Sequence, residues 1–204
     1  MDDRKDLSDY ETLTPLIHNR PKPDSGNLQK RSCFIGISVK LRQQCNAYTG
    51  SHYFPSEPIG TIVNGWRNED IQAQSFAAES FDLVVSLDVT EHVFSPQLMF
   101  SEIFRTLKSG GLYISTFPIR KALVEPTTQL AILLEDGSIE HLKKPEYHGN
   151  PIDGKGALVT WDYGYDIHKR ISEWAPFAVE IMRFCDARHG IIGEYTEVVV
   201  CRKC

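Results

Sequence analysis

A buried strand and an acidic turn are encoded in Ser80-Phe81-Asp82-Leu83-Val84-Val85-Ser86-Leu87-Asp88-Val89-Thr90-Glu91-His92-Val93. The continuous apolar run Leu83–Val85 is typical of a strand that is covered on both faces. Shortly afterwards, Ser95 offers a side-chain cap for a helix, and Pro96 suits the first helical position. The segment therefore predicts a buried strand that leads through a polar turn into a helix.

The predicted helix carries one apolar stripe at four-residue spacing, made of Met99, Ile103 and Leu107. Gly110-Gly111 is expected to end this helix, and Leu112–Phe117 reads as the next strand. A strand, a helix and a second strand in this order form a β-α-β crossover, which requires a parallel sheet covered by helices. The expected fold class is therefore an α/β sandwich.

Weaker signals flank this unit. Ser38–Cys45 reads as a helix and Tyr48–Tyr53 as a strand, whereas Ala178–Phe184 and Tyr195–Cys201 read as an antiparallel pair. The intervening stretch Arg120–Ile167 is rich in loops, and a long loop on an α/β sheet is often a lid or a substrate cover.

Composition limits the class of protein. The chain has 204 residues, with 22 Lys and Arg against 27 Asp and Glu, so its formal net charge is −5. This length favours one domain with a sizeable core, and the mild acidity argues against a broad nucleic-acid interface. No apolar stretch approaches the roughly 20 residues of a membrane span, and the charged start is unlike a signal peptide. We therefore expect a cytoplasmic protein without a nucleic-acid or membrane partner.

The first 30 residues differ from the remainder because they are charged, contain three prolines and lack an apolar period. They are interpreted as a flexible leader (1–30) before one α/β domain (31–204). The five cysteines are an odd number and are expected to be reduced. The C-x-x-C of Cys201 and Cys204 reads as a frayed terminal strand rather than as a zinc or redox site.

Several segments together resemble class I S-adenosylmethionine-dependent methyltransferases, and in particular a subgroup of small bacterial members. The segments that carry the resemblance are Asn68–Ile71, Ser80–Val93, Leu107–Gly111, Glu146–Pro151 and Ala157–Thr160. The resemblance spans roughly residues 36–203. It implies a Rossmann-like sandwich with a mostly parallel sheet and an antiparallel C-terminal strand. The first strand is either shortened to Ser32–Ile35, with Gly36 as its turn, or missing.

The resemblance also implies S-adenosylmethionine as the cofactor, bound at the carboxyl ends of the strands. The residues implied to contact it are Gly36, His52, Asp70, Ile71 and Asp88. His52 stands where the family has a carboxylate for the ribose, and a neutral imidazole can bond one hydroxyl but cannot clamp two. Asp70 would accept from the adenine amine while Ile71 packs the ring; the alternative is a solvated loop acid.

Two histidines are candidate catalytic bases. His92 follows the buried strand, and His148 lies in the polar Tyr147–Pro151 loop. The structural alternatives are a helix-entry histidine bonded to the backbone for His92 and a loop-shaping histidine for His148. No metal is expected, because Asp88-x-x-Glu91-His92 lacks the two histidines of an H-E-x-x-H helix.

Two functions remain open from the sequence. The first is a methyltransferase acting on a small-molecule or saccharide-like acceptor. The second is a catalytically impaired methyltransferase-like domain that serves as a binding or partner protein, which the single glycine at Gly36 and the imidazole of His52 favour.

Overall fold

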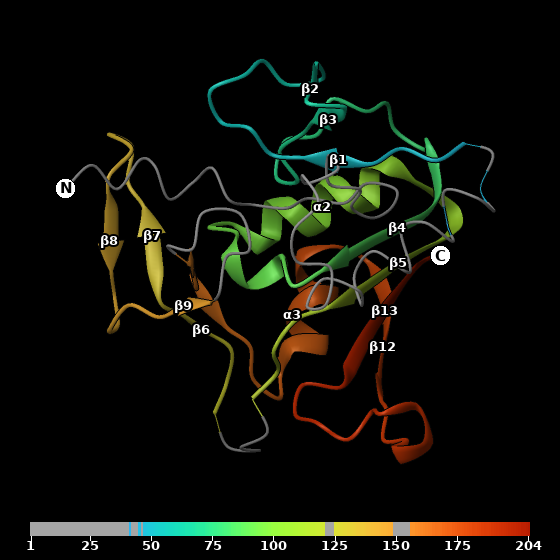
Figure 1. Cartoon of the computed structure of the whole chain (residues 1–204), viewed down its shortest axis with the longest axis vertical. Helices are drawn as coiled ribbons and strands as arrows, with labels where there is room; N and C mark the ends of the chain where they lie inside the picture. Colours follow the sequence, from blue (N-terminus) through green and yellow to red (C-terminus); the bar gives the residue numbers. More distant parts are fainter. Residues whose placement is uncertain (1–40, 42–44, 46, 121–124, 149–155) are drawn as a thin grey trace, which may run out of the picture.

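The computed structural model describes residues 41, 45, 47–120, 125–148 and 156–204. Its main sheet has four strands in the order β12-β13-β5-β4. β4 (Phe81–Leu87) and β5 (Leu107–Thr116) are parallel, whereas β13 (Glu197–Lys203) is antiparallel to both β5 and β12 (Phe177–Arg183). The predicted α/β class is confirmed (Figure 1). The described main sheet is mixed and not mostly parallel, because two of its three strand pairings are antiparallel.

The predicted crossover is present. Helix α2 (Pro96–Thr106) connects β4 to β5, and the Ser95 hydroxyl accepts a hydrogen bond from the backbone N–H of Leu98. Pro96 occupies the start of the helix, as the sequence predicts. Met99 and Ile103 are fully buried, so the predicted apolar stripe faces the core.

The end of α2 differs from the prediction. The helix stops at Thr106, and Leu107 is already extended and belongs to β5. Lys108 therefore leaves the helix and pairs with Asp82 of β4 at 2.8 Å. Gly110 has a φ of 77°, a value that suits glycine, and lies opposite an irregularity in the pairing of β4 with β5. The two glycines thus shape a strand irregularity and do not end a helix.

The predicted C-terminal pair is also present, shifted by one or two residues. β12 and β13 pair without a break from Phe177 with Lys203 to Arg183 with Glu197. Between them, Gly190 has a φ of 74° and ends the short helix η3 (Ala187–His189). This pair places an antiparallel strand next to β5, as the sequence interpretation requires.

A second, smaller sheet has the order β1-β3-β2. β1 (Ser51–His52) is parallel to β3 (Trp66–Asn68), and β2 (Ile62–Val63) is antiparallel to β3. β1 covers only part of the predicted strand 48–53. The predicted first strand at 32–35 lies outside the described residues, as do the leader and most of the predicted helix 38–45.

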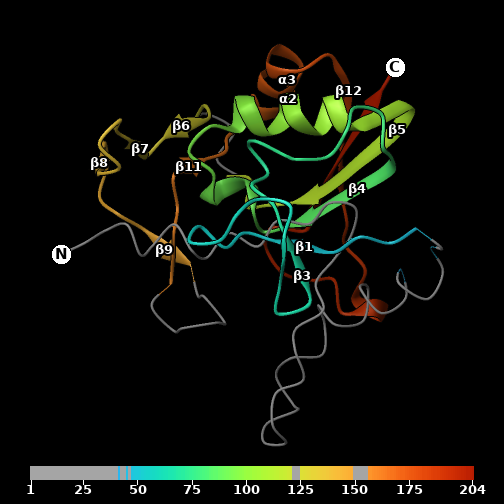
Figure 2. The ribbon, with the colours of Figure 1, turned by 90° about the horizontal axis from the view of Figure 1, so that it is seen from above.

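Helices α2 and α3 (Ile167–Trp174) lie on the same face of the main sheet (Figure 2). Alternate strand residues determine the two faces: Val84 joins the large core cluster beneath the helices, whereas Val85 packs on the other face with Leu41 and Tyr48. Among the described residues no helix is both long and apolar enough to cross a bilayer.

The segment between β5 and α3 forms short strand pairs rather than one continuous loop. These pairs are β6 (Thr128–Gln129) with β11 (Trp161–Asp162), β7 (Ala131–Leu133) with β8 (Ile139–His141), and β9 (Tyr147–His148) with β10 (Ala157–Leu158). All three pairs are antiparallel, and they extend the molecule on the side away from the C-terminus (Figure 1).

The cysteines of the C-x-x-C sequence lie in different environments. Cys201 is fully buried in β13, and burial raises its pKa to about 12, whereas Cys204 is exposed. Because the thiolate is the reactive form, iodoacetamide should alkylate Cys204 and the exposed Cys185 in the folded protein and reach Cys201 only after denaturation. Peptide mass spectrometry measures this difference. Equal labelling of Cys201 and Cys204 in the folded protein would contradict the buried placement.

Candidate functional site

Most of the predicted site residues follow the parallel pair β1–β3 or the strand β4, which is parallel to β5. β1 ends at His52, β3 at Asn68 and β4 at Leu87. The backbone N–H of Glu69 donates to the carbonyl oxygen of His52 at 3.1 Å, which holds the ends of β1 and β3 together. Ligands of open α/β sheets bind beyond such carboxyl ends, so this region is the candidate site.

The residue pair predicted to meet adenine follows β3. Asp70 Oδ1 accepts from the backbone N–H of Gln72 at 2.8 Å, and the N–H of Ala73 donates to the Asp70 carbonyl at 3.0 Å. Burial, as the largest cause, raises the pKa of Asp70. We call residues 70–73 the Asp70 turn. Ile71 is 1% exposed and packs into the main hydrophobic core. This packing holds the Asp70 turn against the core.

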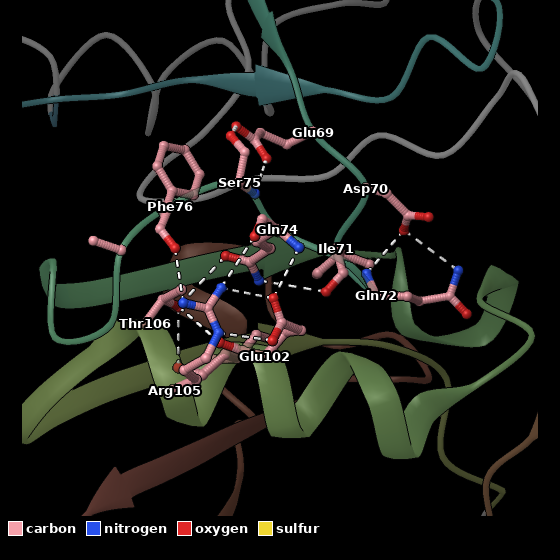
Figure 3. A network of polar contacts seen from close by, with 12 residues as sticks. Glu69, Asp70, Ile71, Gln72, Gln74, Ser75, Phe76, Glu102, Arg105 and Thr106 are labelled. Atoms are coloured by element: carbon pink, nitrogen blue, oxygen red, sulfur yellow. Dashed lines mark hydrogen bonds and ion pairs between the residues drawn. The ribbon is translucent and has the colours of Figure 1, made fainter. Parts of the chain in front are cut away.

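Two ion pairs hold the chain on either side of the Asp70 turn, and Figure 3 shows the one on α2. Glu69 is fully buried, pairs with Arg67 at 2.7 Å and accepts from the backbone N–H of Ser75 at 2.8 Å. On α2, Glu102 accepts from the N–H of Gln74 at 2.9 Å and pairs with Arg105 at 2.8 Å. These contacts fix the loop that follows β3 against α2.

Arg105 completes this attachment with two further bonds. Its guanidinium donates to the carbonyl oxygens of Phe76 at 2.8 Å and Gln74 at 3.0 Å. Neither Arg105 nor Glu102 was predicted from the sequence to be part of a site. Their i, i+3 spacing was a signal for an ion pair on one helix, but it carried no information about the loop that they bind.

Two further residues predicted to bind the cofactor, His52 and Gly36, have different outcomes. His52 is 5% exposed at the end of β1, where its ring lies edge-on to Phe54 at 4.5 Å between centroids. Its position fits the predicted strand-end location, and its contact with ribose remains a prediction. Gly36 lies outside the described residues.

Asp88 directly follows β4 and has a left-handed backbone with a φ of 54°. Its backbone N–H donates to the carbonyl of Thr116, and its carboxylate accepts from the Thr116 hydroxyl at 3.3 Å. The residue keeps solvent exposure, but partial removal of the carboxylate from water and then repulsion by Glu91 raise the pKa of Asp88 to about 6. Its predicted contact with the cofactor is untested.

The short helix η2 (Thr90–His92) presents two buried polar side chains. Glu91 is 1% exposed, and within the described part of the chain neither of its carboxylate oxygens has a hydrogen-bond partner. His92 is also buried, and its Nδ1 lies 2.7 Å from the carbonyl oxygen of Leu158. Because a carbonyl oxygen only accepts, Nδ1 carries the proton and donates. Burial is the largest cause that lowers the pKa of His92.

β9 brings His148 to the same place. The pairing of His148 with Ala157 puts it beside Leu158, the residue that accepts from His92. Its Nδ1 lies 3.6 Å from Glu91 Oε1, and its ring meets that of His92 edge-on at 5.4 Å between centroids. Glu91 is the largest cause that raises the pKa of His148. We call Glu91, His92 and His148 the Glu91 cluster.

Thr160, in the segment predicted to be a lid, is hydrogen-bonded to η2 and to the residue after it. Its backbone N–H donates to the carbonyl oxygen of Glu91 at 2.8 Å, and its hydroxyl donates to the carbonyl of Val93 at 2.7 Å. Trp161 adds a bond from its indole N–H to the Phe94 carbonyl at 3.2 Å. The segment predicted to be a lid is therefore hydrogen-bonded over the turn that carries Glu91 and His92.

A cavity of about 360 Å³ opens beside the Glu91 cluster. Its charged lining residues are Glu91, Arg120, Glu125, Glu146, His148, Asp162 and Glu194, and its aromatic ones are Trp161 and Tyr195. Arg120 forms ion pairs with Asp162 and with Glu125. His148 lines this cavity, whereas His92 lies behind it. Both predicted catalytic histidines thus belong to one cluster, but only His148 borders the open space.

Comparison with known proteins supports the predicted class. Residues 37–115 match the family model described as a methyltransferase domain. This range includes β1, β3, the Asp70 turn, β4 and the Glu91–His92 pair. The match confirms the predicted resemblance to methyltransferases over these 79 of the chain's 204 residues. The bacterial subgroup remains a prediction.

Solved structures give more distant likenesses. A methyltransferase from Mesorhizobium loti is 16% identical, with 70% of this chain and 72% of that chain covered and a TM-score of 0.44. One from Methanosarcina mazei is 14% identical, with 81% and 77% covered and a TM-score of 0.41. Both are described as S-adenosylmethionine-dependent. The search among curated proteins finds no match.

Proposed function

We propose that this protein is an S-adenosylmethionine-dependent methyltransferase that acts on a small, polar, saccharide-like acceptor. The observation that carries the proposal is the family match over residues 37–115, because that range contains both the Asp70 turn and η2. The carboxyl-end location of these two features agrees with the match.

The cofactor is assigned to the region of the Asp70 turn. The hydrogen bond from Gln72 fixes the orientation of the Asp70 carboxylate, which suits an acceptor for the exocyclic amine of adenine. His52, at the end of the neighbouring strand, is assigned one ribose hydroxyl. Gly36 is assigned the methionine end of the cofactor, and Asp88 a further contact with the cofactor, on the resemblance alone. The residues present fit the group, with an imidazole in place of the usual carboxylate.

The acceptor is assigned to the cavity beside the Glu91 cluster. Carboxylates that accept from hydroxyls, together with an arginine and two aromatic side chains, suit a polyhydroxylated molecule. When bound, S-adenosylmethionine supplies a methyl group on a positively charged sulfur, which keeps the electron pair of the broken bond. The hydroxyl proton of the acceptor needs a base. Among the described residues, His148 is the histidine that lines the cavity, so we assign it this role when no metal ion is bound. The 157–161 segment is bonded to η2 and forms part of the cavity wall, so it would help to limit the access of water to the reacting atoms.

A catalytically impaired binding protein is the second candidate. The substitution of an imidazole for the ribose carboxylate at His52 favours it, because one hydrogen bond replaces two. The two candidates separate by experiment: a binding protein would hold S-adenosylhomocysteine but show no turnover with any acceptor.

Asp70→Asn tests the cofactor assignment. Asparagine keeps an oxygen for the turn but removes the charge, so S-adenosylhomocysteine should bind about tenfold more weakly or worse, since a hydrogen bond to a charged group contributes roughly 1.5–3 kcal/mol. Isothermal titration calorimetry measures the affinity. Asp82→Asn, at the opposite end of β4 and paired with Lys108, is the matched control and should bind normally. Equal affinity of the two variants would remove Asp70 from the site, and a folded wild-type protein without binding would overturn the proposal.

A further inference from the structure

The geometry of the Glu91 cluster is that of ligands around a shared centre. Glu91 Oε1 lies 3.8 Å from His92 Nε2 and 3.6 Å from His148 Nδ1, and all three ligand atoms lie within 4.8 Å of one another. These separations are too long for good hydrogen bonds. Bonds of about 2.0–2.2 Å to a tetrahedral ion place its ligands about 3.4 Å apart. The two separations from Glu91 are close to this value, whereas the two histidine atoms are known only to lie within 4.8 Å of each other.

The buried carboxylate of Glu91 needs a positive partner. It is 1% exposed, and neither oxygen accepts a hydrogen bond from the described residues. A buried charge without hydrogen bonds is costly. Protonated His148 would compensate it only from 3.6 Å, beyond hydrogen-bond distance, whereas an ion bound by the carboxylate would compensate it directly. Arg120 lines the same cavity, but its guanidinium pairs with Asp162 and Glu125 instead. Glu146, also in the lining, adds negative charge.

His92 is oriented as metal-binding histidines usually are. Its Nδ1 donates to the backbone carbonyl of Leu158 at 2.7 Å, which leaves the lone pair on Nε2, the atom that faces Glu91. Such a bond from the distal ring nitrogen fixes the tautomer and the ring plane of a ligand. The strand pair β9–β10 carries both Leu158 and His148, so one local structure positions both imidazoles.

We propose that Glu91, His92 and His148 bind one divalent first-row transition-metal ion, such as zinc or manganese. Two imidazoles and one carboxylate favour this class over magnesium and calcium, which prefer oxygen ligands. Three protein ligands leave coordination positions open, and Glu91 and His148 border the cavity, so those positions face it. The ligand that completes the site is an oxygen donor, either water or a hydroxyl of the acceptor.

This inference deepens the proposed function and rests on it for the identity of the acceptor only. With an ion in place, His148 would act as a ligand and not as the base: the ion would make the acceptor hydroxyl more acidic, and the proton would pass to solvent water in the open cavity. It also revises the expectation from sequence. Asp88-x-x-Glu91-His92 contains one histidine, and only the fold supplies the second from β9.

Cobalt(II) provides the direct test, because its visible absorption reports its ligands. The full-length protein is stripped with a chelator, desalted and titrated with Co²⁺ by absorption and with Zn²⁺ by calorimetry. We expect one ion per chain at micromolar affinity or tighter, and no binding of Mg²⁺ at the same concentrations. Glu91→Gln and His148→Gln should each weaken binding about a hundredfold or more, since even loss of a ligand's supporting partner costs about 10- to 100-fold.

A matched control is available on the surface. His189 pairs with Asp186 at 2.7 Å and is exposed, so His189→Gln removes a similar histidine–carboxylate pair and should leave metal binding unchanged. The thermal unfolding temperature and the affinity for S-adenosylhomocysteine are measured for every variant. A folded His148→Gln protein that keeps cofactor affinity but loses cobalt binding supports the site.

Two results would overturn the inference. One is a folded wild-type protein that binds neither Co²⁺ nor Zn²⁺. The other is unchanged binding in both cluster variants, or a thiolate absorption band, which would place the ion on surface histidines or cysteines. If S-adenosylhomocysteine binds and metal does not, only this inference fails. If metal binds and S-adenosylhomocysteine does not, the proposed function fails.

Discussion

Gly164→Ala should lower the free energy of unfolding by about 3 kcal/mol or more, at the upper end of what overpacking usually costs. A methyl group at Gly164 would lie 2.6 Å from the carbonyl carbon of Pro126 and 2.8 Å from the backbone nitrogen of Thr127. These neighbours are backbone atoms, which cannot rotate away as a side chain can. The backbone N–H of Gly164 also donates to the Thr127 hydroxyl. An added methyl group would therefore force residues 125–127 and Gly164 apart.

Denaturant unfolding followed by circular dichroism measures this loss. Gly193→Ala is the matched control, because an added methyl group there meets no atom within 4 Å, and it should be nearly neutral. The contact between residues 125–127 and Gly164 lies next to two residues that line the cavity, Glu125 and Asp162. Equal stability of the two variants would mean that residues 125–127 do not lie against Gly164.

Arg105→Gln should weaken binding of S-adenosylhomocysteine about tenfold, although Arg105 contacts no predicted ligand atom. The substitution removes the bonds from α2 to the carbonyl oxygens of Gln74 and Phe76 and leaves Glu102 without its cation. The loop after the Asp70 turn then loses its attachment. Binding must supply the free energy of ordering it, roughly 1–2 kcal/mol for each residue that is fixed.

Hydrogen exchange distinguishes this cause from general destabilisation. Exchange at residues 72–77 should accelerate in Arg105→Gln while the amides of β13 remain protected. Arg188→Gln, on the exposed η3, is the control and should change neither exchange nor affinity. Wild-type affinity in Arg105→Gln, together with faster exchange in the loop, would show that the order of this loop does not matter for binding.

The sequence predicted the parts of the fold that depend on local signals. The cap at Ser95, the proline at the helix start and the apolar run of β4 each act over a few residues, and all three features appear in the structure. The end of α2 was wrong because the buried Leu107 fits a helix stripe and a strand equally well. Only its pairing with Phe81 in the sheet decides between them.

The site was predicted less completely than the fold, because long-range contacts build it. His92 and His148 were separate candidates in the sequence, and the contact between Leu158 and His92 unites them. Glu91 appeared only as a letter in a motif, since burial without a hydrogen bond has no sequence signature. The part of the cofactor site at Gly36 lies outside the described residues, so its contribution stays a prediction.

The side chain of Gln72 links the Asp70 turn to the segment that follows η2. Its amide nitrogen donates to Asp70 at 3.4 Å, and its amide oxygen accepts from the backbone N–H of Ser95 at 2.8 Å. Ser95 follows η2 by three residues. A nucleoside that restricts the motion of the Asp70 turn would therefore also restrict the segment that follows Glu91 and His92. Such coupling is reciprocal. A ligand bound at the Asp70 turn should therefore raise the affinity of the cavity beside the Glu91 cluster for its own ligand, and the reverse should also hold.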